Sequence, residues 1–231
     1  MKQALMTVVA VTIVFVLASG AGAALVRLDF GTPTSPVVSG VDALAAAADP
    51  AAFGSYGLNV WDARSAAAYP GSESNPSFTG LLDTVTGQAT SAYISFTGTV
   101  YSYDATGWGT GVGDLRSDFL ANTYGDIGFT IGGLLANTET KLFVTSQEFT
   151  TWQDQTAWLT VNGTSYHATQ NGVLITVTTD GSGSISGTWH KTTGESDLTG
   201  LQISQQPIPE PATMGLLVLG GLALLRKRRA L

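Results

Sequence analysis

The chain of 231 residues is long enough for one or two domains, and it contains no cysteine. A disulfide framework, a thiol nucleophile and a cysteine-ligated zinc site are therefore excluded. When residues 1–23 and 209–231 are set aside, the middle keeps 5 basic and 16 acidic side chains, a formal charge of −11. A domain this acidic, without a basic stripe, repels phosphate backbones, so we expect no nucleic-acid partner.

The N-terminus has the three parts of a secretory signal. Lys2 gives a positive start, residues 4–18 form an apolar run, and a small-residue stretch follows with an A-x-A site at Ala21 and Ala23. Small side chains are needed there because signal peptidase binds the peptide in extended form in shallow pockets. The sequence therefore predicts a helical signal peptide at residues 1–23, with an uncleaved membrane anchor as the alternative.

Between residues 24 and 206 the chain alternates apolar and polar residues with period two. Short β-branched runs separated by Gly, Asn and Asp predict an all-β domain, an antiparallel β-sandwich. The runs lie at residues 93–97, 127–131, 142–144, 159–161, 173–178 and 201–203. Residues 43–48 are alanine-rich and predict a short helix or a loop, whereas residues 70–80 are typical of a loop.

Three dipeptides in the second half of the chain favour tight turns. Asn162-Gly163, Asn171-Gly172 and Asp180-Gly181 follow one another at intervals of about nine residues. Asn, Asp and Gly accept the positive φ angles that two-residue hairpin turns require. We therefore expect a run of successive hairpins in this region.

Several of these segments resemble a galactose-binding-like domain, as found in carbohydrate-binding and malectin-like modules. Residues 26–31 are similar to the first strand of that family, and residues 129–135 followed by 141–144 are similar to its central loop-to-strand step. Residues 158–163 resemble a strand ending in a turn, and residues 198–203 resemble the last strand. The resemblance covers most of the middle in short pieces and implies a jelly-roll-like sandwich.

The C-terminus combines three unlike features. Pro209-Glu210-Pro211 is followed by a chargeless apolar run at residues 212–225 and then by Arg226-Lys227-Arg228-Arg229. A helix of 14 residues covers about 21 Å. Flanking residues and snorkelling side chains bring it close to the roughly 30 Å of a bilayer core. Because the four cationic residues stay in the cytoplasm, we predict a transmembrane helix at residues 212–225.

In this order and spacing, Pro209-Glu210-Pro211, residues 212–225 and the basic residues 226–229 resemble the PEP-CTERM sorting signal of Gram-negative bacteria. The resemblance implies recognition by an exosortase, a membrane transpeptidase with a cysteine nucleophile, which releases or transfers the domain. The two prolines keep the motif extended and accessible to such an enzyme. An ordinary C-terminal tail anchor is the alternative.

Catalytic chemistry has little support in the sequence. His167 and His190 lie in strand-like surroundings outside any motif, and no G-x-S-x-G sequence occurs. The acidic residues show no spacing that singles out a glycosidase pair, and no glycine-rich phosphate loop opens a helix. We expect no enzyme activity, no catalytic residue and no cofactor.

Metal binding is weakly supported at one place. Asp104, Asp114 and Asp118 flank the glycine-rich stretch 106–113. Calcium takes six to eight oxygen ligands, and the resemblance to galactose-binding-like domains permits a structural calcium. No D-x-D-x-D loop occurs, so a solvated acidic loop is the expectation and no metal ligand is assigned.

Sugar binding would use exposed aromatic platforms, because a pyranose face stacks on Trp or Tyr while polar neighbours bind its hydroxyls. Trp108 lies in the glycine-rich region near Tyr101 and Tyr103, and Trp152 lies between strands. Trp108 and Trp152 are therefore the candidate glycan contacts. The tryptophans at strand-like positions are expected to fill the core: Trp61, Trp158 and Trp189.

Together these features predict a signal peptide at residues 1–23, a β-sandwich domain at 24–206 and a sorting tail at 207–231. We expect an exported, non-catalytic protein that passes through the inner membrane to the cell surface or extracellular matrix of a Gram-negative bacterium. A carbohydrate-binding module for exopolysaccharide is the alternative, and a small secreted hydrolase is the third. The expected partners are signal peptidase, exosortase, the membrane and, for the alternative, exopolysaccharide.

Overall fold

A computed structural model describes the following residues: 24–30, 45–53, 62–64, 71–84, 86–104, 118–146, 156–191 and 194–205. The chain divides into two compact units, residues 22–206 and a second unit formed by residues 1–21 with 207–231. All described residues belong to the first unit. The predicted signal peptide and transmembrane helix lie outside them, and no helix among the described residues is long and apolar enough to cross a membrane.

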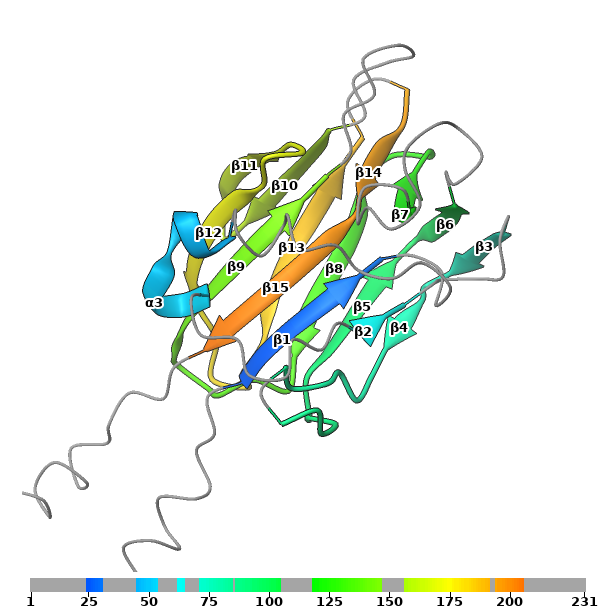
Figure 1. Cartoon of the computed structure of the whole chain (residues 1–231). Coiled ribbons are helices and arrows are strands. Elements are labelled where there is room, and N and C mark those ends of the chain that lie inside the picture. The colour runs from blue at the N-terminus through cyan, green and yellow to red at the C-terminus, as the bar shows by residue number, and fades with distance from the viewer. Residues whose placement is uncertain are drawn as a thin grey trace, which may run out of the picture. The chain divides into compact units, whose positions relative to one another are not determined.

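In the described part of the chain, most residues with regular structure are in strands (Figure 1). The strands are β1 (Ala24–Asp29), β2 (Asp62–Ala63), β3 (Gly71–Ser74), β4 (Ser77–Phe78), β5 (Tyr93–Thr97), β6 (Thr99–Asp104), β7 (Asp118–Asn122), β8 (Ile127–Gly132), β9 (Glu139–Thr145), β10 (Ala157–Val161), β11 (Thr164–Ala168), β12 (Val173–Thr178), β13 (Ile185–His190), β14 (Ser196–Leu198) and β15 (Gly200–Gln205). Helix α3 spans Pro50–Phe53. The six predicted strands correspond to β5, β8, β9, β10, β12 and β15, and the predicted first strand corresponds to β1.

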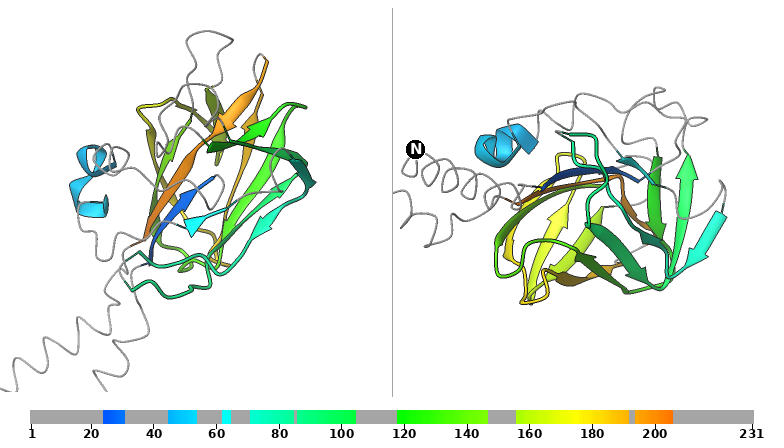
Figure 2. Two further views of the ribbon diagram at one scale, coloured as in Figure 1. Left: turned by 45° about the vertical axis from the view of Figure 1, so that its right-hand side comes forward. Right: turned by 90° about the horizontal axis from the view of Figure 1, so that it is seen from below.

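The strands form three sheets. A five-stranded sheet has the order β12-β9-β15-β1-β2, a six-stranded sheet β11-β10-β13-β8-β5-β4, and a four-stranded sheet β14-β7-β6-β3. Every pairing is antiparallel apart from the short parallel one between β1 and β2. Figures 1 and 2 show the five-stranded and six-stranded sheets facing each other. The prediction of an antiparallel all-β architecture is confirmed, and the layered arrangement is consistent with the jelly-roll resemblance.

The hydrophobic core lies between these two sheets, because alternate side chains of their strands point inward. Val26 and Leu28 of β1 are fully buried, and the same cluster takes in Ile127 and Phe129 of β8. Burial of each large apolar side chain contributes about 1.5–3 kcal/mol. Trp189 of β13 is also fully buried, as predicted, and its indole Nε1 donates to Ser196 Oγ at 2.8 Å.

The hairpin prediction is confirmed at one of three turns. Asn162 and Gly163 have φ angles of 48° and 77° and join β10 to its antiparallel partner β11. Asn171-Gly172 instead joins β11 to β12, and Asp180-Gly181 joins β12 to β13, and in both cases the two strands belong to different sheets. The expected run of hairpins is therefore wrong. A turn dipeptide fixes a local reversal of the chain, whereas packing decides which sheet the next strand joins.

Gly172 shows what such a crossing requires. Its φ angle is 75°, and a Cβ atom at this position would lie 2.2 Å from the ring of Phe143. An L side chain is strained at this φ, and the ring leaves no room for one. The crossing from β11 to β12 therefore depends on glycine.

Two expectations for the first third of the chain had different outcomes. Residues 45–48 are helical, which confirms the helix at the alanine-rich segment. Residues 70–80 contain β3 and β4, so the loop prediction is wrong there. Strand β3 has no apolar side chain to give a period-two signal, and its sequence reads GSES.

Helix α3 lies against the outer side of the five-stranded sheet (Figure 2). The ring of Phe53 lies 6.3 Å from that of Phe143, and Lys141 Nζ donates to Asp49 Oδ2. This hydrogen bond is the main reason why the pKa of Asp49 lies below its usual value. The contact fastens the helical segment to strand β9.

Strands β1 and β15 are neighbouring inner strands of the five-stranded sheet, so the first and last described residues lie side by side at the same end of these two strands. Ala24 is the direct partner of Gln205 in the antiparallel register. The Gln205 amide accepts from Leu135 N at 2.6 Å and donates to Leu135 O and Thr140 Oγ1, both at 2.9 Å. The last described residue is thus held by its own buried side chain.

Candidate functional site

The outer face of the six-stranded sheet is open and rich in hydroxyl groups. Strands β5, β8, β10, β11 and β13 alternate, so the side chains that do not enter the core point outward. We define the outer face by residues that are exposed or half-exposed: Ser95, Thr97, Thr130, Trp158, Thr160, Ser165, His167, Ser186, Thr188 and His190. A face of this kind can form many hydrogen bonds without enclosing a ligand.

One row of this face carries aromatic rings. The register makes Trp158 of β10 the partner of His167 on one side and of His190 on the other. The indole of Trp158 is 36% exposed, and it stacks on the His167 imidazole with centroids 4.4 Å apart and planes 10° apart. His167 Nε2 lies 2.7 Å from Thr156 Oγ1, which holds the imidazole in place.

Trp158 was predicted to fill the core, and this prediction is wrong. Its neighbours Ala157 and Leu159 are buried and point into the core, so the pleat turns Trp158 to solvent. The alternation along the strand indicates the correct orientation. Leu159 and Val161 are two residues apart and share the core-facing side, so Trp158, which is next to Leu159, must point to the opposite side. The prediction relied on the large apolar side chain of tryptophan and not on the alternation of side chains along the strand.

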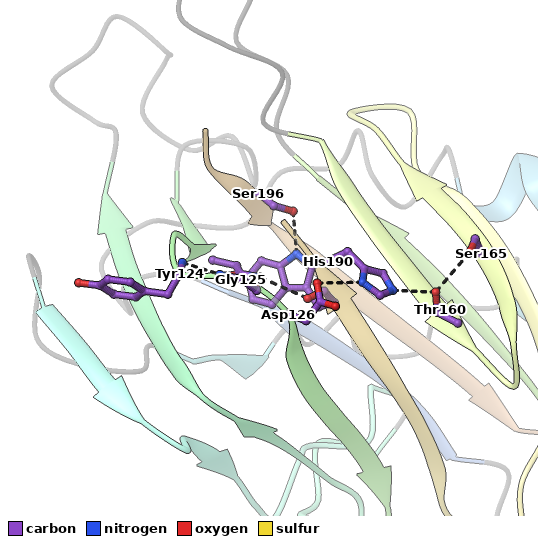
Figure 3. Close-up of polar contacts among 9 residues, drawn as sticks. Tyr124, Gly125, Asp126, Thr160, Ser165, His190 and Ser196 are labelled. Atoms are coloured by element: carbon purple, nitrogen blue, oxygen red, sulfur yellow. Dashed lines mark hydrogen bonds and ion pairs between the residues drawn. The ribbon is translucent and has the colours of Figure 1, made fainter. Parts of the chain in front are cut away.

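His190 connects two polar groups at the end of the row (Figure 3). Its Nδ1 lies 3.0 Å from Asp126 Oδ1, and its Nε2 lies 2.8 Å from Thr160 Oγ1. Ser165 Oγ follows at 3.3 Å from Thr160 Oγ1. A role for His190 could not be predicted from the sequence, because Asp126 and Thr160 lie far from it along the chain and no local motif joins them.

A buried asparagine positions Asp126. Asn122 Nδ2 donates to the carbonyl of Gly125 and, at 3.2 Å, to that of Trp189. Asn122 Oδ1 accepts from the backbone N–H groups of Tyr124 and Gly125, both at 3.3 Å. This turn, which Figure 3 shows, therefore presents Asp126 beside the outer face, where its side chain is 63% exposed.

The same turn exposes a second aromatic group. The Tyr124 side chain is 73% exposed, and its hydroxyl lies 2.7 Å from that of Tyr101 on β6. The two rings are 5.7 Å apart and tilted by 36°. Tyr101, which precedes Trp108 in the sequence, is thus the half-buried partner of the exposed Tyr124.

A hydroxyl, an imidazole and a carboxylate in this order also occur at nucleophilic sites. Thr160, however, lies on β10, which is paired on both sides, so the backbone N–H groups around it form hydrogen bonds to the neighbouring strands. Nucleophilic acyl transfer needs preorganised donors for the oxyanion. The arrangement is therefore better suited to binding hydroxyl groups than to bond cleavage.

A buried carboxyl lies apart from this face, in β14. Asp197 is fully buried, and neither of its carboxyl oxygens has a hydrogen-bond partner among the described residues. Burial raises the pKa of Asp197 well above its usual value, and the nearby charge of Glu195 adds to the effect. Folding thus favours the protonated form of this carboxyl relative to the unfolded chain.

Most residues singled out in the sequence lie beyond the part of the chain that the structure describes: Ala21, Ala23, Trp61, Trp108, Asp114, Trp152, Pro209, Glu210, Pro211, Arg226, Lys227, Arg228 and Arg229. The candidate glycan contacts Trp108 and Trp152 are therefore still predictions. Within the described residues, no three His, Asp or Glu side chains come together as a metal-binding group.

A comparison with protein families identifies the C-terminal segment. The profile described as the PEP-CTERM protein-sorting motif matches residues 207–229. This match confirms the resemblance drawn from Pro209-Glu210-Pro211 and the residues that follow, and it indicates an exported protein that an exosortase processes at the membrane. No curated protein sequence matches the chain.

Proposed function

We propose that this protein is a non-catalytic component of the cell surface or extracellular matrix, and that its jelly-roll-like β domain binds glycans through the outer face. The sorting motif at residues 207–229 supports the location, because exosortase substrates are exported and sorted to the surface. The binding role depends on the geometry of the six-stranded sheet.

The observation that carries the binding role is the exposed pair of Trp158 and His167. Large aromatic side chains left on a strand face lose the stabilisation of burial, which a ligand can restore. The pair stands among hydroxyl side chains, and a sugar ring needs this combination of a flat apolar surface and polar neighbours. Strand spacing of about 4.8 Å gives the row from β11 to β8 a length of about 14 Å, enough for a short oligosaccharide.

A glycan panel titrated against the protein tests this role. Replacing Trp158 with alanine should weaken saturable binding by roughly 30-fold, because truncating an aromatic anchor costs about 2 kcal/mol. The matched control is Thr178→Ala, an exposed strand position on the other sheet, and its affinity should be unchanged. Equal affinities for Trp158→Ala and wild type would contradict the glycan-binding face.

A structural matrix component without a specific ligand is the second candidate. The charge of −11 in the middle of the chain favours it, because an acidic surface keeps a secreted protein soluble and can associate through cations. Absence of binding to every glycan in the panel, together with calcium-dependent self-association in light scattering, would favour this candidate over the binding module.

A small hydrolase is the third candidate, and the order Thr160, His190 and Asp126 is the one feature that favours it. We expect the purified protein to show no turnover of chromogenic esters above that of buffer. Turnover that disappears in His190→Asn would overturn the non-catalytic role.

A further inference from the structure

The hydrogen bonds around His190 have a definite direction. An ionised carboxylate only accepts hydrogen bonds, so the Nδ1 atom that faces Asp126 at 3.0 Å must carry the proton. In a neutral imidazole the other nitrogen is then an acceptor. In this neutral form the Thr160 hydroxyl donates its hydrogen to His190 Nε2 across 2.8 Å.

This direction decides what the outer face offers to a ligand. The hydrogen of Thr160 is used by His190, so Thr160 Oγ1 is left as an acceptor, and Ser165 is its next neighbour at 3.3 Å. Asp126 adds a carboxylate that is 63% exposed. Near Trp158 the outer face therefore offers hydrogen-bond acceptors, Thr160 Oγ1 and the Asp126 carboxylate, and a ligand that matches them needs hydrogen-bond donors.

One cation lies close by along the chain. Lys191 follows His190 directly and keeps its charge, and its Nζ is directed to the carbonyl of Thr123. The domain as a whole carries a charge of −11. A carboxylate-bearing sugar brought to Asp126 would meet a like charge and an acceptor, whereas an ammonium group would meet an opposite charge.

We propose that the outer face selects glycans that present hydrogen-bond donors, with amine-bearing pyranose chains preferred and uronates rejected. The inference rests on the proposed function, since it names the ligand class of the same face. Two strand spacings, about 10 Å, separate Trp158 on β10 from Asp126, the residue directly before β8. The stacked ring and the ammonium group therefore belong to different sugar units, and the ligand is an oligosaccharide.

Calorimetric titration of the full-length protein in detergent tests the preference. The probes are a β-1,4-linked glucosamine tetramer, its fully N-acetylated counterpart and a uronate tetramer. We expect the amine-bearing tetramer to bind about two- to fivefold more tightly than the N-acetylated one, as an exposed ion pair gives, with a difference that shrinks as salt is added. The uronate should bind more weakly than both, and the glucosamine monomer should show no preference over its N-acetylated form.

Two variants separate a specific contact from general charge attraction. Asp126→Asn should remove the preference for the amine and leave the affinity for the N-acetylated tetramer unchanged. Glu139→Gln is the matched control, because it removes one negative charge at an exposed position on the five-stranded sheet. If the preference survives in Asp126→Asn, or is lost equally in both variants, the proposed contact is wrong.

Nitrogen-15 NMR of the imidazoles gives a readout that needs no ligand. In the neutral imidazole of wild-type His190 the proton should be on Nδ1, and Asp126→Ala, which removes the acceptor, should shift the proton towards Nε2. A proton on Nε2 in the wild type would overturn the inference and leave the glycan-binding role standing. Absence of binding to all three tetramers would overturn the proposed function itself, and the ligand class with it.

Discussion

The buried carboxyl of Asp197 makes the stability of the domain depend on pH in an unusual direction. Its side chain is fully buried and has no hydrogen-bond partner among the described residues, and burial raises its pKa, so it loses its proton at a higher pH in the folded protein than in the unfolded chain. In the unfolded chain an aspartate ionises above about pH 4. The unfolded state therefore loses its proton first as the pH rises, and the free energy of unfolding falls between the unfolded and the folded pKa.

Replacing Asp197 with asparagine should remove this dependence. Both side chains are buried polar groups that cost about 1–3 kcal/mol without a partner, so wild type and variant should have similar stability near pH 4. Above pH 4 the variant should become the more stable of the two. The difference should grow by up to about 1.4 kcal/mol for each pH unit until the folded carboxyl ionises.

Urea unfolding followed by tryptophan fluorescence at several pH values between 4 and 8 measures the effect. Glu139→Gln serves as the control for the loss of one negative charge, because its side chain is exposed. Parallel stability curves for wild type and Asp197→Asn would show that the folded pKa of Asp197 is not raised. A wild type that gains stability over the variant with rising pH would refute the assignment of an unpaired carboxyl.

Three further substitutions test the core and the end of the domain. Trp189→Phe removes the indole donor to Ser196 and should cost about 1–3 kcal/mol in urea unfolding, whereas a neutral result would mean that this hydrogen bond adds nothing. Gly172→Ala should cost more than about 1 kcal/mol, because it combines a φ of 75° with a clash against Phe143, and thermal unfolding should show a lower Tm. Gln205→Met breaks the amide contacts that hold the end of β15 and should speed amide hydrogen exchange in that strand before any other, a result that uniform protection would contradict.

The strands could be predicted from the sequence because alternation is local. Residues 127–131 give apolar side chains at every second position, and β8 buries those side chains. Strand β3 could not be found in this way, because an edge strand with the sequence GSES buries no apolar side chain. The sequence also did not indicate that β12 and β13 belong to different sheets, because this depends on which strands pack around the core.

The candidate site was harder to predict than the fold for a related reason. His167, Trp158 and His190 become neighbours only through the register of β11, β10 and β13. Strand β13 comes more than twenty residues after β10, and β11 and β12 intervene in the sequence. The alternation of side chains along β10 is enough to predict that Trp158 points outward. Predicting its neighbours His167 and His190 also requires the order of the strands in the sheet.

The position of β15 has a mechanical consequence for a chain that is held by its C-terminal side. The strand has six register partners on β1 and six on β9, so a pull along its axis loads all these backbone hydrogen bonds at once, in shear. A pull between the two ends of the domain would instead open the β1–β15 pair one bond at a time, because Ala24 and Gln205 are neighbours. If a polymer binds the six-stranded sheet as proposed, tension between that polymer and the C-terminal side of the domain would load β15 in shear, the geometry that resists force more strongly.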